Sequence, residues 1–139
     1  IGSWRIHADR SLMSPITLDI KRTVKDTVRL PFEKMAAAAL PKGFQLSLVI
    51  CGDRLAQRMN IEYRKKTYRP NVLSFPLSKA EVEIFLNIRK AAREAKQEGI
   101  SRDARLALLF VHGCFHLAGY DHSDKMESLE QKVLKKFGF

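Results

Sequence analysis

The sequence lacks long hydrophobic runs and has few cysteines. No stretch of about eighteen or more apolar residues occurs, and no charged leader followed by an apolar run opens the chain, so we expect neither a membrane span nor a secretory signal. Cys51 and Cys114 are too few for a disulfide framework, and each is expected to be a small buried hydrophobe. These absences predict a soluble, cytoplasmic protein.

Acidic residues are also scarce relative to basic ones. Fifteen Asp and Glu stand against 25 Lys and Arg, which gives a formal net charge of +10. Such a charge favours association with polyanions such as nucleic acid. It is equally compatible with a domain whose basic residues are spread over solvated faces, so the motifs must decide between the two.

The size of the chain predicts one domain spanning residues 1–139. A chain of 139 residues that is 45% hydrophobic can bury one core but is short for two. The first residue is Ile1 rather than Met. We interpret residues 1–15 as either a remnant of expression or a loosely ordered terminus, and neither they nor His7 enter the fold prediction.

Helices are predicted from capping residues and apolar spacing. Pro31 precedes an alanine-rich segment, and Asp53 is a candidate N-cap. Gly99 closes a polar helix, and either Ser101 or Asp103 caps the longest apolar segment. The predicted helices span residues 32–40, 54–63, 89–98, 104–117 and 124–137.

Three short strands are predicted, over residues 45–50, 72–75 and 83–88. Pro70 keeps the basic segment 64–71 from being helical. The strands are too few for a doubly wound sheet, and there is no regular strand–helix repeat. We therefore predict an α+β fold, in which a small mixed β-sheet packs against several α-helices.

Three of the four histidines, His112, His116 and His122, fall within an eleven-residue window. Residues four apart lie on one face of a helix, so His112 and His116 can reach the same point. Gly119 allows the chain to leave the helix and return His122 to that point. Three imidazoles with a fourth position open for water or substrate are typical of a catalytic zinc site. We predict one Zn²⁺ per chain at the C-terminal end of the main apolar helix.

Two neighbouring residues limit the alternatives. Cys114 sits about 200° round the helix from His112 and should face the core rather than the metal. Zinc peptidases share this histidine spacing, but their general base follows the first histidine, where this chain has Gly113. A peptidase that uses Asp121 or a substrate group as its base stays open. Asp121 could also orient a ligand histidine or cap the following turn.

The window H-G-x-x-H-L-x-G-Y-D-H resembles the YbeY family of single-strand-specific metallo-endoribonucleases involved in ribosomal RNA maturation. Two further segments, 60–64 (N-x-x-Y-R) and 71–76 (N-V-L-S-F-P), match the family in the expected order. The segments 83–84 and 126–130 are similar to its strand and C-terminal helix. The resemblance covers about residue 31 to the end, and Thr67, Pro70 and Val82 depart from it.

The resemblance implies a metal-dependent endoribonuclease that cuts single-stranded RNA, in 16S rRNA 3′-end maturation and ribosome quality control. It implies ribosomal RNA or the ribosome as partner, zinc held by His112, His116 and His122, and Arg64 as the catalytic cation of the cleft. The planar guanidinium of Arg64 matches two phosphate oxygens, so the chemistry agrees. Without the motif, Arg64 is an ordinary solvated cation at a helix end.

Residues that contact RNA are less defined by the sequence. Base-stacking candidates are Tyr68, Phe75 and Tyr120, although Phe75 is more expected in the core. Eight further cations could follow a phosphate backbone: Arg54, Arg58, Lys65, Lys66, Arg69, Arg89, Lys90 and Arg93. Two other functions stay open, a non-enzymatic zinc-braced RNA- or ribosome-binding module and a zinc hydrolase of another substrate class, such as a peptidase. The nucleophile, the native metal and the oligomeric state are not determined by the sequence.

Overall fold

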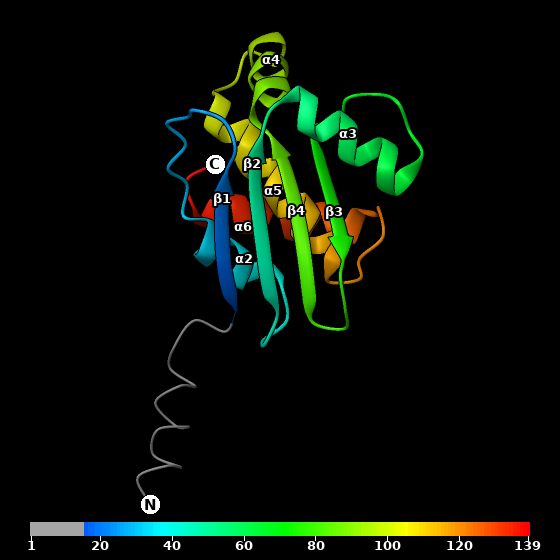
Figure 1. Ribbon diagram of the computed structural model, residues 1–139. Helices are drawn as coiled ribbons and strands as arrows, with labels where there is room; N and C mark the ends of the chain where they lie inside the picture. The colour runs from blue at the N-terminus through cyan, green and yellow to red at the C-terminus, as the bar shows by residue number, and fades with distance from the viewer. Residues whose placement is uncertain (1–15) are drawn as a thin grey trace, which may run out of the picture.

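The computed structural model describes residues 16–139, so the interpretation of residues 1–15 and of His7 lies outside the described residues. No helix within this range is both long and apolar enough to cross a membrane. The elements, labelled in Figure 1, are β1 (Thr17–Arg22), α2 (Phe32–Ala39), β2 (Gln45–Cys51), α3 (Asp53–Arg64), β3 (Val72–Pro76), β4 (Glu81–Asn87), α4 (Ile88–Glu98), α5 (Arg102–Leu117) and α6 (Asp124–Lys136).

The strands form one mixed sheet of four, in the order β1-β2-β4-β3. β1, β2 and β4 run parallel, with Ile20 opposite Leu48 and Leu48 opposite Ile84. β3 pairs antiparallel with β4. The prediction of an α+β fold with a small mixed sheet is therefore confirmed.

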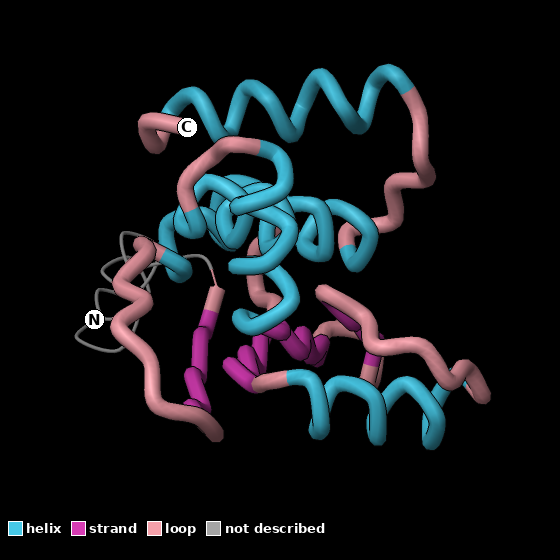
Figure 2. Tube along the Cα trace, turned by 90° about the horizontal axis from the view of Figure 1, so that it is seen from above, coloured by secondary structure: helices cyan, strands magenta, loops and turns pink. Residues whose placement is uncertain are grey.

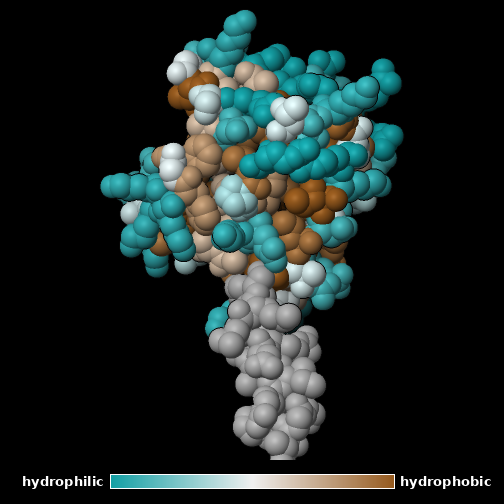
Figure 3. All heavy atoms as spheres, turned by 90° about the vertical axis from the view of Figure 1, so that its left-hand side faces the viewer, coloured by the Kyte–Doolittle hydropathy of each residue, from teal (hydrophilic) through white to brown (hydrophobic). Residues whose placement is uncertain are grey.

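Strand β1 was not predicted from the sequence. Five of its six residues are exposed, and its sequence, TLDIKR, carries three charges. Among the strands of residues 16–139 it pairs only with β2 and forms an edge of the sheet, and charged residues are a common protection of such edges. Seen from this side, the surface is largely hydrophilic, with apolar atoms gathered near its centre (Figure 3). The strand is specified by its partner rather than by its own hydrophobic pattern.

The two faces of the sheet are covered unequally. α2, α5 and α6 lie on one side and α3 lies on the other, as the view from above shows (Figure 2). Alternation along β2 sends Leu46, Leu48 and Ile50 into the larger core, and Val49 and Cys51 into a smaller core under α3. The position of α5 against the larger core determines where the histidines lie.

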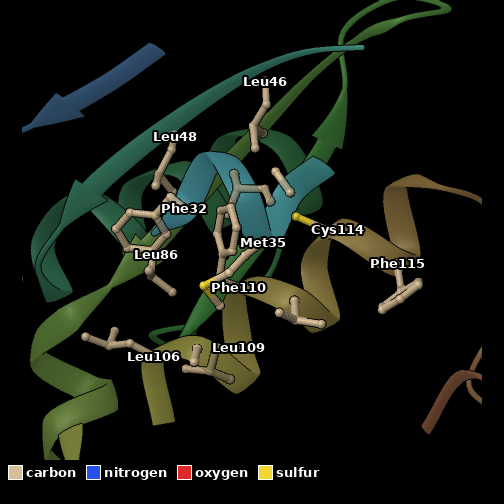
Figure 4. Close-up of a cluster of buried hydrophobic side chains, with 14 of the residues drawn as sticks. Phe32, Met35, Leu46, Leu48, Leu86, Leu106, Leu109, Phe110, Cys114 and Phe115 are labelled. Carbon is tan, nitrogen blue, oxygen red and sulfur yellow. The ribbon is translucent and has the colours of Figure 1, made fainter. Parts of the chain in front are cut away.

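Helix α5 is packed between the sheet, α2 and α6 through one apolar face. Leu106, Phe110 and Cys114 follow each other at intervals of four on this face and are fully buried (Figure 4). The ring of Phe110 meets that of Phe32 edge-on, with centroids 4.9 Å apart. Cys51 and Cys114 are both buried and free, as predicted. Burial raises the pKa of the Cys114 thiol, which is held protonated in the core.

Helix boundaries differ in detail from the prediction. The N-cap of α3 is Gly52, and Asp53 is instead the first helical residue. Ser101, rather than Asp103, caps α5, because its hydroxyl accepts a hydrogen bond from the Ala104 N–H at 3.0 Å. Strand β4 starts at Glu81 and ends one residue before Ile88, which begins α4.

The carboxylate of Asp53 is used for tertiary pairing rather than capping. Arg93 donates two hydrogen bonds to it, at 2.8 and 2.9 Å, and Asn87 donates a third at 3.0 Å. Asn87 is fully buried, and its side-chain oxygen Oδ1 caps α4 by accepting hydrogen bonds from the N–H groups of Arg89 and Lys90. These bonds connect the beginnings of α3 and α4.

We predict that Asp53→Asn lowers the free energy of unfolding by about 1 kcal/mol at pH 7, a modest figure because the Arg93 side chain is half exposed and screened. The hydrogen bonds from Arg93 lower the pKa of Asp53 from 3.8 to about 2. A lowered folded-state pKa contributes stability above the unfolded value and loses it as the pH falls from about 4 to 2. Urea unfolding of both proteins across this range should therefore show the difference shrinking with acid. Asp103→Asn, which breaks an exposed pair, is the control, and a difference that does not depend on pH would contradict the assignment.

Candidate metal centre and its cleft

The structure brings the three predicted histidines together at the end of α5. The Nε2 atoms of His112 and His116 are 3.0 Å apart. The ring of His122 lies with its centroid 4.9 Å from that of His112 and 4.6 Å from that of His116. One ligand atom from each of the three falls within 4.8 Å of the others, so the cluster could hold a metal ion.

His122 reaches the cluster through a turn that begins at Gly119. This residue has φ +100°, a conformation that favours glycine, as the sequence predicted. The Tyr120 N–H donates to the Phe115 carbonyl at 3.1 Å and closes the end of α5. Ser123 then accepts a hydrogen bond from the Met126 N–H and caps α6. His122 is therefore held on a short connection between two capped helix ends.

Two histidines of the cluster are oriented by hydrogen bonds at their outer nitrogens. His112 Nδ1 is 2.7 Å from the carboxylate of Glu130, and His116 Nδ1 is 3.2 Å from the carbonyl oxygen of Tyr120. Since a carboxylate and a carbonyl only accept, we assign the proton of each ring to Nδ1, which donates. The Nε2 atoms then carry lone pairs.

This assignment leaves two lone pairs facing each other at 3.0 Å, an arrangement that is repulsive without a cation between them. A tetrahedral zinc ion with Zn–N bonds of about 2.0–2.1 Å separates its ligand nitrogens by about 3.3 Å. The observed spacing is close to that value. The donor set, its tautomers and its geometry therefore fit a tetrahedral metal such as zinc.

The electrostatics of the cluster favour a neutral imidazole at His116. Burial lowers the pKa of His116 below its ordinary 6.5, and the neighbouring His112 and His122 lower it further. A neutral imidazole is the form that binds metal. At neutral pH, His116 is therefore available as a ligand.

Arg64 and the histidines share one cleft, of about 1130 Å³. Arg64 is the last residue of α3 and is exposed, with its Nη1 atom 3.4 Å from the hydroxyl of Tyr68. β3, α5 and α6 provide the other walls. The structure thus brings together all four residues that the sequence singled out for the site.

The loop after Arg64 is fixed by side chains of α3. Lys65 adopts a left-handed conformation, with φ +57°, and ends the helix. Gln57 donates a hydrogen bond to the Thr67 carbonyl at 2.8 Å, and the buried Asn60 donates one to the Tyr68 carbonyl at 2.9 Å. Asn60 of the N-x-x-Y-R segment therefore holds the loop beside Arg64.

The eight other cations do not line the histidine cleft. Arg54, Arg58 and Arg89 line a separate cavity of about 780 Å³, against the sheet face that α3 covers in part. Arg93 pairs with Asp53. A cation that the sequence analysis passed over, Arg105, does line the histidine cleft, but Glu94 and Glu98 pair with it.

The residue of the site whose role the sequence analysis missed is Glu130. It was noted only as part of the helix that resembles the family. The sequence does contain an indication of this role. Glu130 falls on the apolar face of α6 with Met126, Val133 and Leu134, and a carboxylate buried there needs a partner because an unpaired one is costly. Asp121, considered for the same role, is exposed and has no hydrogen-bond partner between residues 16 and 139.

Gly113 faces the sheet rather than the histidines. A Cβ atom there would lie 3.4 Å from Ile84 Cδ1, 3.6 Å from Val72 Cγ2 and 3.8 Å from Ser74 Cβ. A methyl group fits, but a longer side chain would run into β3 and β4. A side chain at the position that supplies the base in zinc peptidases would therefore start toward the sheet here, although the Gly113 backbone lines the histidine cleft.

The comparisons with known proteins agree with one another. The sequence model of a family described as "Endoribonuclease YbeY" matches residues 10–138. The chain is 34% identical to the endoribonuclease YbeY of Polynucleobacter asymbioticus, over 91% of this chain and 92% of that protein. It is 36% identical to the protein of that name from Methylobacillus flagellatus, over 78% of each. A Thermotoga maritima protein solved in solution has the same fold, with a TM-score of 0.63 at 19% identity over 88% of both chains.

We predict that Glu130→Gln weakens the binding of a divalent metal about 10-fold, because an amide supports His112 less strongly than a carboxylate does. The measurement is competition for Zn²⁺ against a chromophoric chelator. Glu127→Gln is the matched control, since Glu127 lies on the same helix and lines the same cleft but is exposed. Equal affinities for the two variants would show that Glu130 does not support the ligand.

A second prediction concerns Gly113. Gly113→Ala should keep or raise the free energy of unfolding by up to about 1 kcal/mol, because the methyl meets ordinary contacts and alanine favours helix. Gly113→Glu should lower it by at least about 2 kcal/mol, because a charge is forced between α5 and the sheet. Urea unfolding monitored by circular dichroism distinguishes the two. A stable Gly113→Glu protein with peptidase activity would show that the position opens toward the cleft.

Proposed function

Because this chain belongs to the YbeY endoribonuclease family, we propose that it hydrolyses phosphodiester bonds of RNA in the cleft of His112, His116 and His122. The observation that carries the proposal is the pair of Nε2 atoms that face each other at 3.0 Å while Glu130 and Tyr120 hold the opposite nitrogens. That arrangement suits a metal-dependent nuclease.

The metal that we propose is one Zn²⁺ per chain. Three imidazoles are a ligand set that suits zinc, and three protein ligands leave a position for water or substrate. When bound, zinc supplies Lewis acidity toward a phosphoryl oxygen and helps to deprotonate a nucleophile at neutral pH. His112 and His116 would be the pre-oriented ligands, and His122 would provide the third ligand from the turn.

Arg64 is proposed as the catalytic cation. Its guanidinium is exposed at the wall of the histidine cleft, and the last turn of α3 and the fixed loop behind it hold its backbone in place. A planar donor pair can bind two oxygens of one phosphate and stabilise the negative charge that develops there. Arg64 thus binds and orients the phosphate, while the histidines hold the metal.

We propose single-stranded RNA as the substrate, in particular ribosomal RNA at the 16S 3′ end and in ribosome quality control, and the cytoplasm as the compartment. The net charge of +10 and the family support this substrate. We also propose that residues 1–139 form one domain, because all the described strands belong to one sheet and the helices pack around it.

A non-enzymatic module braced by zinc is less well supported. A bracing metal is expected to have four protein ligands and to replace a core. Here the cluster offers three, and the larger core is packed from α2, α5, α6 and the sheet without any of these histidines. The fold should therefore survive metal removal.

We predict that the chain binds about one zinc and cuts a labelled single-stranded RNA. His116→Ala should lose both properties, since it removes a central ligand. Arg64→Ala should keep the zinc but cut about 100-fold more slowly, because a charge-stabilising donor is lost. Metal content, cleavage rate and product ends are measured together, and the ends identify the nucleophile.

Arg58→Ala is the control for lost charge, because Arg58 lines the other cavity and should leave cleavage unchanged. EDTA should stop cleavage without changing the circular dichroism spectrum. Full activity of Arg64→Ala would remove that residue from the site. Bound zinc with RNA affinity but no cleavage would favour the binding module.

A further inference from the structure

Tyr63 places an aromatic ring on the wall of the histidine cleft. It immediately precedes Arg64 at the C-terminal end of α3 and lines the cleft together with the three histidines. Tyr63 is 63% exposed, more than any other large hydrophobic residue between 16 and 139. An aromatic ring and a cation therefore stand side by side at the proposed reaction site.

The ring of Tyr63 is supported from the core. Its centroid lies 5.1 Å from that of Phe75, with the planes inclined by 47°. The ring of Phe75 in turn meets the ring of the buried Phe85 edge-on, with centroids 6.1 Å apart. A series of three rings therefore runs from the smaller core to the cleft, and Tyr63 is held in place before any ligand arrives.

Tyr63 differs from the two other tyrosines. The hydroxyl of Tyr68 lies 3.4 Å from the Nη1 atom of Arg64. The ring of Tyr120 packs edge-on against that of Phe115, with centroids 5.6 Å apart. Neither of them lines the histidine cleft. Within the described part of the chain, the Tyr63 hydroxyl has no hydrogen-bond partner, and Phe75 is the one aromatic ring that the Tyr63 ring contacts.

We propose that Tyr63, backed by Phe75, stacks against an unpaired base of the RNA strand while Arg64 contacts a neighbouring phosphate. This inference rests on the proposed function and identifies a residue that determines substrate specificity. Aromatic side chains stack on any exposed base face, and adjacent basic groups bind the backbone.

Stacking on Tyr63 explains a preference for single strands in physical terms. In a duplex each base is already stacked on both neighbours and paired, so its face is not available to the protein. An unpaired base can turn out and lie on the ring. Tyr63 should therefore improve binding of single-stranded RNA and contribute little to binding of duplex RNA.

The test compares Tyr63→Leu, which removes the ring, with Tyr63→Phe, which keeps it. Substrates are one labelled oligoribonucleotide, single-stranded or annealed to its complement. Tyr63→Leu should raise KM for the single strand about 10-fold, keep kcat within about 2-fold and reduce the preference over duplex. Tyr63→Phe should stay near wild type. Ile61→Ala removes exposed apolar surface from the same helix outside the cleft and should change nothing.

A second readout reports stacking directly. An oligonucleotide that carries 2-aminopurine should be quenched on binding to wild type and Tyr63→Phe, before the first turnover, and not on binding to Tyr63→Leu. An unchanged KM and quench in Tyr63→Leu, or an equal defect in Tyr63→Phe, would overturn the proposal. If the wild type cuts no RNA, the proposed function fails, and the quenching experiment alone decides whether Tyr63 stacks.

Discussion

The packing of α5 against the sheet is the constraint on which the site depends. Once Phe110 and Cys114 are buried on one face of the helix, His112 and His116 must emerge on another, toward β3 and α6. At Gly113 the space between the helix and the sheet accepts a methyl group but not a longer side chain. The packing of the core therefore determines the direction of the His112 and His116 side chains.

Hydrogen bonds then fix the orientation of the side chains that the packing directs into the cleft. The buried Glu130 and the backbone of Tyr120 select one tautomer for each of two histidines, so that both inner nitrogens are available to a cation. A parallel arrangement operates at the other wall, where Gln57 and Asn60 hold the loop behind Arg64. Polar groups of α3, of α6 and of the turn after α5 thus shape two sides of one cleft.

The sequence predicted the parts of this structure that depend on local chemistry. Ligand spacing on a helix, the turn at Gly119 and the burial of Cys114 follow from periodicity and glycine conformation, and all are observed. Strand β1 was missed because its pairing with β2 is a property of the sheet. The role of Glu130 was missed for the same reason, since its partner His112 lies on another helix. The placement of the cations depended on the packing of α3 and α4, which directs Arg54, Arg58 and Arg89 to the other cavity.

The cleft also draws its chemistry from two distant parts of the chain. The histidines occupy residues 112–122, a segment that can gather a metal locally, whereas the arginine and its neighbouring ring belong to the end of α3. If α5 and α6 were assembled and α3 were not docked, the three histidines would be close together but Arg64 and Tyr63 would not be beside them. The complete cleft therefore exists only when α3 is packed on the sheet, so the arrangement of the site depends on the whole fold and not on the histidine segment alone.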